Sequence, residues 1–164
     1  MSSPFSAARI DLRGAHLGPL EPASCQKLAE AIAAIPPWST MNYPADAMAR
    51  FLVSSADGAY RYRIEAGGEP AGAVSIRQPW LKGPYLELLA ILPPFQNRGI
   101  GAEILDWFER EALRAEARNL WVCASGFNER ALRFYQRHGF EQAVALPGLV
   151  GDGYTEILLR KYPL

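Results

Sequence analysis

The sequence predicts an α/β fold in which a mixed sheet is flanked by helices, and two observations support this prediction. Short apolar runs of strand length alternate with longer segments that carry an apolar stripe at helical spacing. From residue 85 to residue 124 the order is strand, helix, strand, which favours two parallel strands joined by a right-handed crossover. With 164 residues and no repeat or linker, the chain is expected to form a single domain over residues 1–164.

The first half of the chain predicts two helices and three strands. Leu28, Ile32 and Ile35 share one face of the first helix, which Pro36 and Pro37 end. Later, aromatic and arginine side chains alternate as in a strand, and a Gly-Gly pair then turns the chain into the next strand. In chain order, the expected strand, two helices and two strands cover residues 9–12, 22–34, 45–53, 60–64 and 71–76.

The second half carries the stronger signals. An apolar run of strand length is followed by a loop with two prolines and by a helix whose stripe contains Ile104, Leu105 and Phe108. A later short helix has Asn128 as its N-cap and Gly139 behind its last turn. In chain order, the expected strand, helix, strand, helix and two closing strands cover residues 85–91, 99–118, 119–124, 128–137, 140–146 and 154–161.

Composition excludes several classes of protein. The 17 basic and 17 acidic residues balance, so the chain lacks the basic footprint of a nucleic-acid-binding or membrane-surface protein. Cys25 and Cys123 lie far apart and in no metal-ligand spacing, which indicates a reducing compartment. His16, expected in a loop, and His138, expected at a helix end, do not suggest a metal site. We therefore expect a cytoplasmic protein without a metal, a nucleic-acid partner or a membrane segment.

The loop from Gln96 to Gly101 (QNRGIG) lies between a predicted strand and a predicted helix. Its two glycines let the backbone turn tightly, and the first amide groups of the helix point outward without intrahelical partners. A diphosphate suits this arrangement, because the helix dipole favours an anion and Arg98 can add a charge-assisted contact. A P-loop would need Gly-Lys-Ser/Thr, and a dinucleotide-binding loop would need a glycine where Ile104 stands, so the sequence argues against both.

These residues resemble the GNAT superfamily of acyl-CoA-dependent N-acyltransferases. The resemblance covers roughly residues 85–161 and is strongest in two blocks, the Gln/Arg-x-x-Gly-x-Gly/Ala signature and a segment on the later helix. The matching positions are Gln96, Gly99, Gly101, Asn128, Ala131, Tyr135, Gly139 and Phe140. The resemblance implies a mixed, mostly antiparallel sheet whose central parallel strands splay apart to admit the cofactor. It also implies that acetyl-CoA is the acyl donor.

The resemblance implies a role for each matched position. Backbone amides from Arg98 to Ala102 would hold the CoA pyrophosphate, and Ile91 would pair its backbone with the pantetheine arm. The Leu89 amide would stabilise charge on the thioester oxygen. Tyr135 would protonate the departing thiolate, because a phenol with a pKa of about 10 stays protonated at neutral pH; the alternative is a core aromatic. The implied cofactor-binding residues are Leu89, Ile91, Gln96, Asn97, Arg98, Gly99, Ile100, Gly101, Ala102, Asn128 and Tyr135.

Glu87 is the candidate general base, because an amine acceptor arrives mostly as ammonium and must lose a proton. Alternation along the strand puts Glu87 on the same side as Leu89, where a partly buried carboxylate could accept that proton directly or through water. The alternatives are a carboxylate on a solvent-facing rim and one that is paired with an arginine. The candidate catalytic residues are therefore Tyr135, Glu87 and Leu89.

Trp38, Tyr43 and Trp80 are the candidate residues for binding the acceptor. They stand next to prolines in loops that border the acceptor site in the family, and such aromatics can form a wall for an amine or a ring. The alternative is that they only cover the core.

Taken together, the sequence predicts an N-acetyltransferase that moves an acetyl group from acetyl-CoA directly to a primary amine in a ternary complex. Direct transfer is favoured because no candidate nucleophile stands beside the expected thioester position. The alternative is a non-catalytic acyl-CoA sensor or an interaction domain on the same scaffold. The sequence leaves open the acceptor, which can be a small molecule or a peptide, as well as the acyl chain preference. Homodimers are common in the family, but the oligomeric state is also left open.

Overall fold

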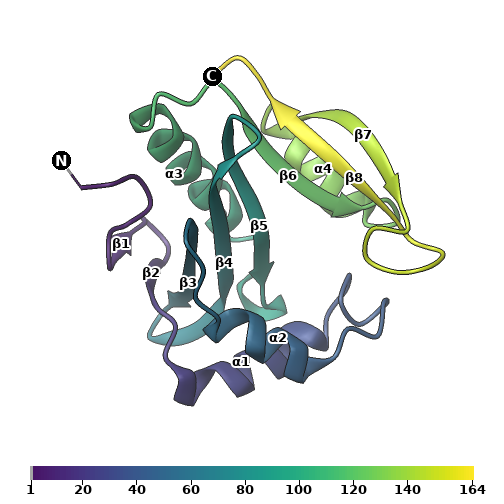
Figure 1. Cartoon of the computed structure of the whole chain (residues 1–164). Helices are drawn as coiled ribbons and strands as arrows, with labels where there is room; N and C mark the ends of the chain where they lie inside the picture. The colour runs from purple at the N-terminus through teal and green to yellow at the C-terminus, as the bar shows by residue number, and fades with distance from the viewer. Residues whose placement is uncertain (1) are drawn as a thin grey trace.

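The structure, a computed structural model, describes residues 2–164 and contains one eight-stranded sheet (Figure 1). The strands are β1 (Ile10–Asp11), β2 (His16–Pro19), β3 (Ala59–Ala66), β4 (Glu69–Trp80), β5 (Gly83–Ile91), β6 (Leu120–Ser125), β7 (Glu141–Pro147) and β8 (Thr155–Lys161). Their order in the sheet is β1-β2-β3-β4-β5-β6-β8-β7. All neighbours are antiparallel except β5 and β6, so the predicted mixed, mostly antiparallel sheet is confirmed.

Four α-helices cover the two faces of the sheet. They are α1 (Pro22–Ala33), α2 (Ala45–Val53), α3 (Ile100–Arg114) and α4 (Glu129–Arg137), and a short 3-10 turn (Pro93–Phe95) precedes α3. Helices α1 and α2 pack together on one face, whereas α3 and α4 lie on the other face behind the strands in Figure 1. The predicted α/β class is therefore confirmed.

Alternate residues of the central strands belong to two separate apolar clusters, one on each face of the sheet. On β4, Val74 and Ile76 join the larger cluster with α3 and α4, whereas Ala73 joins the cluster beneath α1 and α2. Ile104 and Phe108 of α3 are fully buried in the larger cluster. Because both faces are covered, the central strands read as nearly continuous apolar runs in the sequence.

Two sequence expectations about elements are wrong. His16 does not lie in a loop: it begins β2 and lies opposite Glu65, with 2.5 Å between Nε2 of the ring and Oε2 of the carboxylate. The short segment contains Gly18 and Pro19 and so lacks strand alternation, and it is ordered by pairing with β3. Helix α3 ends at Arg114 rather than at residue 118, because Glu116 adopts a left-handed φ of 54° that ends the helix.

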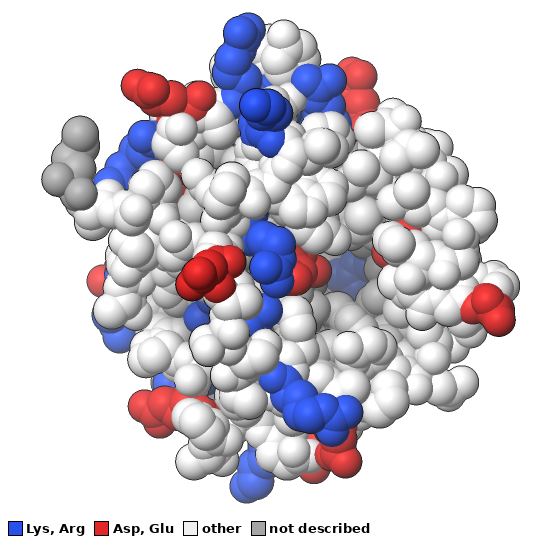
Figure 2. Space-filling model, viewed as in Figure 1, with Lys and Arg blue, Asp and Glu red and all other residues white. Residues whose placement is uncertain are grey.

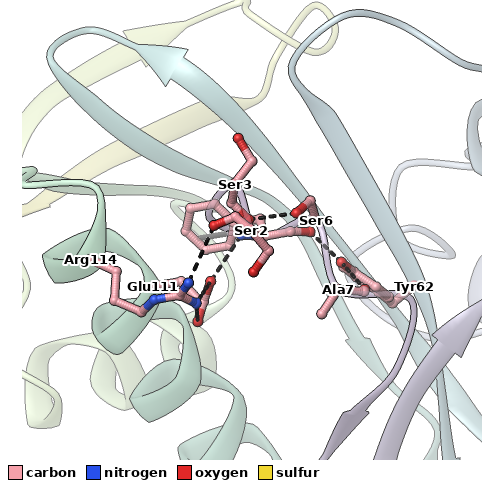
Figure 3. A network of polar contacts seen from close by, with 8 residues as sticks. Ser2, Ser3, Ser6, Ala7, Tyr62, Glu111 and Arg114 are labelled. Carbon is pink, nitrogen blue, oxygen red and sulfur yellow. Dashed lines mark hydrogen bonds and ion pairs between the residues drawn. The ribbon is translucent and has the colours of Figure 1, made fainter.

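The segment before β1 is tied to α3 and β3 by a polar network in which Ala7 bonds to Tyr62 and Ser2 bonds to Arg114 (Figure 3). The Phe5 ring is only 1% exposed and meets the Trp107 ring edge-on at 5.6 Å. The Phe5 backbone N–H donates to Glu111 of α3 at 3.0 Å, and the Tyr62 hydroxyl donates to the carbonyl groups of Phe5 and Ala7. This N-terminal segment is therefore a part of the main core.

Phe5→Ala is expected to lower the free energy of unfolding by about 3 kcal/mol, because it removes a fully buried aromatic ring and leaves a cavity. Denaturant unfolding would measure the loss. Phe127→Ala is the matched control, because Phe127 is 42% exposed and its removal should change stability little. Equal losses in the two variants would contradict a core role for the N-terminal segment.

Candidate functional site

The parallel strands β5 and β6 separate towards their C-terminal ends (Figure 1). The last pair in their register is Leu86 with Val122, whereas β5 continues to Ile91 and β6 continues to Ser125. A cavity of about 490 Å³ is lined by residues of both separated ends. The predicted splay is therefore confirmed, and it opens the sheet at a place where a ligand can reach the backbone of both strands.

A bulge in β5 determines which side chains face each side of this opening. The register of β4 and β5 shifts between Ser75 and Ile76, which leaves Glu87 as an extra residue without a partner. Glu87 consequently meets the Ser75 side chain on the face of α1 and α2, whereas Leu89 packs on the opposite face. The expectation that Glu87 and Leu89 share one side is wrong, because a bulge reverses the alternation.

The backbone of β5 beyond the bulge offers unpaired groups to the gap. The Leu92 N–H donates to the Ala71 carbonyl at 2.8 Å, so the even-numbered residues here bond towards β4. By strand alternation, the N–H groups of Leu89 and Ile91 point to the other side, where β6 has moved away. The Ile91 carbonyl accepts from Nε2 of Gln96 at 2.8 Å, so its N–H is the group left for a ligand.

The loop that follows β5 has the backbone geometry of an anion site. Asn97 and Gly99 adopt left-handed φ values of 61° and 81°, and Gly99 is the N-cap of α3. A Cβ on Gly99 would meet nothing within 4 Å, so the space in front of the helix is open. By contrast, a Cβ on Gly101 would lie 3.1 Å from the Phe134 ring, so this glycine permits close packing of α3 against α4. The first N–H groups of α3 therefore face open space with the positive end of the helix dipole behind them.

The other predicted loop residues differ in what they offer. The Arg98 side chain is exposed, and its guanidinium lies 5.5 Å from the centre of the Phe95 ring. Ile100 is buried in the main core and Ala102 is half-buried, so only their backbone N–H groups suit an anion. These positions match a loop that binds phosphate mainly through its backbone.

Arg130 of α4 belongs to this site, although it was not among the residues expected from the sequence. Its Nη1 donates to Oε1 of Gln96 at 2.8 Å, and its Nη2 donates to Oδ1 of Asn97 at 2.9 Å. The guanidinium thus fixes both side chains that shape the loop and adds positive charge beside it. The sequence contained one signal for Arg130: it stands two residues after Asn128, inside the second block that resembles the family.

Helix α4 presents two predicted residues to the cavity, Asn128 and Tyr135. The Oδ1 atom of Asn128 caps the helix by accepting from the Ala131 N–H at 3.2 Å, which leaves its Nδ2 group able to donate to a ligand. Tyr135 is 7% exposed. Burial raises the pKa of Tyr135 well above its ordinary value, and the nearby Cys123 adds to this shift. The phenol is therefore a neutral proton donor throughout the physiological range.

Glu87 lines the cavity but is already bound by neighbours. Its Oε2 accepts from the Ser75 hydroxyl at 2.9 Å, and its Oε1 accepts from Arg77 at 3.2 Å. A second guanidinium, that of Arg61, lies 3.8 Å from Oε2. Of the alternatives that the sequence left open, the arginine-paired carboxylate is the one present, and its charge is largely balanced.

A second carboxylate in the cavity, Glu156 of β8, was missed in the sequence because it stands in a strand with no motif around it. It is 7% exposed, and its Oε1 accepts from the Ser125 hydroxyl at 2.5 Å. Tyr85 and Cys123 lie beside it, and burial raises the pKa of both groups, so both are uncharged at neutral pH. None of the ion pairs among residues 2–164 includes Glu156.

The predicted acceptor residues separate into two groups. Trp38 and Tyr43, in the loop between α1 and α2, line the cavity. Trp80 lies outside it at the β4–β5 turn, where its ring stacks on that of Tyr85 at 4.6 Å. Trp80 can therefore support the cavity wall only through Tyr85. This fits the alternative that Trp80 covers the core and does not bind the acceptor.

Within the part of the chain that the structure describes, no three His, Cys, Asp or Glu side chains are grouped as metal ligands. Over the same residues, no helix combines the length and apolar character needed to cross a membrane.

One splayed parallel pair, with an open helix N-terminus behind the loop at its end, places this fold in the acyltransferase class that the sequence resembles. The sequence profile of the acetyltransferase (GNAT) family matches residues 26–140, which include α2, α3, α4 and strands β3 to β6. The chain belongs to this family.

Comparison with known proteins supports the same class. The chain is 31% identical over 101 residues to the aminoalkylphosphonate N-acetyltransferase of Salmonella typhimurium, which covers 57% of this chain and 64% of that protein. The chain spans between half and two thirds of the length of the first curated relatives that it matches.

Solved structures show the same fold at low identity. An acetyltransferase from Thermus thermophilus is 21% identical, with a TM-score of 0.70 over 94% of this chain and 100% of that one. RimL, a ribosomal L7/L12 alpha-N-protein acetyltransferase in complex with coenzyme A, is 16% identical, with a TM-score of 0.71 over 93% and 96% of the two chains.

Proposed function

We propose that the protein is an N-acetyltransferase that moves the acetyl group of acetyl-CoA directly to a primary amine in a ternary complex. The observation that carries this proposal is the cavity between the separated ends of β5 and β6. Tyr135 lines this cavity, and the chain continues from β5 through the loop to the open N-terminus of α3. The family supports acetyl transfer, and the name of the Salmonella relative supports an amine as acceptor.

The residues of the site fit acetyl-CoA. The unpaired N–H groups of β5 can hydrogen-bond to the extended pantetheine arm as they would to a neighbouring strand. The loop before α3 can donate its N–H groups to the CoA diphosphate. Leu89 and Ile91 would bind the arm, and the backbone from Arg98 to Ala102 would bind the diphosphate, with Gln96, Asn97 and Arg130 holding the loop. The Nδ2 group of Asn128 would donate to the arm from the facing helix. When bound, the thioester supplies an activated acetyl group.

The side chains around the cavity can supply the required proton transfers. Tyr135 would donate a proton to the sulfur as the bond between carbon and sulfur breaks, and the Leu89 N–H would stabilise negative charge on the acetyl oxygen. A cavity carboxylate would take the proton that the ammonium group loses. Glu87 is the residue that the sequence offers for this role, and Glu156 is the second carboxylate in the same cavity.

Among the described residues, Cys123 is the only thiol that lines the cavity, and its environment argues against a covalent acetyl-enzyme there. Burial raises the pKa of the Cys123 thiol, so the nucleophilic thiolate is scarce at neutral pH. The environment of Cys123 therefore favours direct transfer to the amine over a two-step route through an acetyl-cysteine.

The proposal is tested by two measurements on the purified protein. Calorimetric titration with acetyl-CoA should give saturable binding, and release of free CoA should require an added primary amine. Mass spectrometry of the protein incubated with acetyl-CoA alone should detect no acetylated Cys123. Binding without amine-dependent release across a broad panel would favour the alternative of a non-catalytic acyl-CoA sensor, and absence of binding would contradict both.

A further inference from the structure

We propose that the acceptor is a primary amine on an uncharged, apolar body, and that Glu156 binds its ammonium group and receives its proton. This inference rests on the proposed function, since it concerns the acceptor end of the same cavity. It separates this protein from the Salmonella relative, whose name specifies an acceptor with a phosphonate group.

The charges that line the cavity are all negative. Among the described residues, Glu87 and Glu156 are the only Asp or Glu side chains that line the cavity, and no lysine, arginine or histidine lines it. A phosphonate or carboxylate next to the reacting amine would lie beside Glu156, which has no cationic partner among the described residues. Such a like-charge contact in a partly buried site disfavours acidic acceptors.

The two carboxylates differ in how they are neutralised. Glu87 is flanked by Arg77 at 3.2 Å and Arg61 at 3.8 Å, so its charge is balanced within the protein. Glu156 is 7% exposed and has one hydrogen bond, from Ser125, and no ion pair among the residues that the structure describes. A buried carboxylate that lacks a cationic partner is costly, so a cation bound in the cavity would stabilise it. An ammonium group beside Glu156 supplies that cation.

Apolar side chains from two loops form the outer wall of the cavity. Trp38, Met41 and Tyr43 come from the loop between α1 and α2, and Leu149 and Val150 come from the loop between β7 and β8. The two loops approach each other at one end of the sheet in Figure 1, and Figure 2 shows a hollow on this face.

The loops are joined to each other, and their apolar residues are free to meet a ligand. The Tyr154 hydroxyl donates to the Thr40 carbonyl at 3.2 Å, which links the second loop to the first. Leu149 and Val150 are 59% and 52% exposed, although large apolar side chains usually seek contacts. A cavity with mostly apolar walls and a few charged or polar groups is the usual form of a site for a small amphipathic ligand.

Glu156 and Tyr135, on opposite faces of the sheet, would accept and donate the protons that move during acetyl transfer. The ammonium group would give one proton to the Glu156 carboxylate, and the free amine would form a bond to the acetyl carbon. The bond from that carbon to sulfur breaks, the sulfur takes the proton of Tyr135, and the second amine proton passes to water as the amide forms. Exchange with water then returns a proton to Tyr135 and removes the surplus from Glu156.

Three related amines test the acceptor class: phenethylamine, phenylalanine and 2-aminoethylphosphonate. The first has an apolar, uncharged body, and the others add a carboxylate or a phosphonate near the amine. Phenethylamine is expected to bind about tenfold more tightly than either, and to be acetylated with a kcat/KM that is higher by a similar factor. Equal or better binding of an acidic amine, or no binding of phenethylamine, would overturn the inference.

Three variants test the residue: Glu156→Gln, Glu156→Asp and Glu87→Gln. Loss of the Glu156 charge is expected to weaken phenethylamine binding about tenfold, because a charged hydrogen bond is lost. It should also move the rise of kcat/KM to higher pH, since only free amine then reacts. Glu156→Asp should recover part of both effects, and Glu87→Gln should affect binding less. If Glu156→Gln binds phenethylamine as the wild type does, with the same pH profile, the assignment is wrong.

Two controls separate failure of this inference from failure of the proposed function. Melting temperature and acetyl-CoA affinity are measured for every variant. The affinity should match the wild type in all three, and the melting temperature should match in the two Glu156 variants, whereas Glu87→Gln leaves Arg61 and Arg77 without their partner and should melt lower. Phenethylamine binding is measured calorimetrically without acetyl-CoA as well as with CoA. If the wild type does not bind acetyl-CoA, the proposed function fails, yet amine binding to the free protein still decides whether Glu156 forms an amine site.

Discussion

Tyr135→Phe is expected to lower kcat for amine acetylation about 100-fold while leaving the affinity for acetyl-CoA nearly unchanged. The variant keeps the ring, which packs against Phe134 and Phe140, and removes only the hydroxyl of this cavity-lining residue. Without this donor, the CoA sulfur would leave as an unprotonated thiolate, which is a poorer leaving species in a site with little water.

Two measurements complete the test of Tyr135. Calorimetry with acetyl-CoA and the melting temperature should agree between wild type and Tyr135→Phe, because the variant keeps the packing of the ring against Phe134 and Phe140. The pH profile adds a second criterion. Since burial raises the pKa of Tyr135, the acid form persists, and its ionisation should cause no loss of activity below about pH 10. Unchanged kcat in Tyr135→Phe would exclude the residue as the acid.

Gly99→Trp is expected to weaken acetyl-CoA binding about 100-fold or more, as judged by calorimetric titration. Position 99 is the N-cap of α3, and a Cβ there would project into open space. An indole at this point would fill the place where the first N–H groups of the helix bind the diphosphate, and the loss of several such bonds accounts for the magnitude.

A second glycine provides a matched control for backbone strain. Gly68, in the turn between β3 and β4, has a φ of 80°, nearly the value of 81° at Gly99, and a Cβ there also meets nothing within 4 Å. Gly68→Trp therefore carries a similar conformational cost at a distance from the predicted loop. The two variants should lose similar stability, and only Gly99→Trp should lose acetyl-CoA binding. Saturable binding by Gly99→Trp would show that the cofactor does not lie on this loop.

The sequence by itself determined the elements whose signals are local. Helix α2 has the predicted ends, Ala45 and Val53, because a proline-rich loop and a serine bound an amphipathic run. The strand, loop and helix around Gly99 were recognisable because tight turns and helix starts depend on residues that are neighbours in the chain. The cap at Asn128 was predicted for the same reason and is confirmed by its bond to the Ala131 N–H.

Only the tertiary structure decided which distant side chains meet in the cavity. The bulge at Glu87 depends on the register between two strands and reversed the face of that residue. Glu156 and Ser125 meet because β8 lies beside β6, and Arg130 reaches Gln96 because α4 packs against the loop before α3. Strand register and helix packing depend on the burial of many apolar groups from distant parts of the chain. They therefore cannot be predicted from a short sequence pattern.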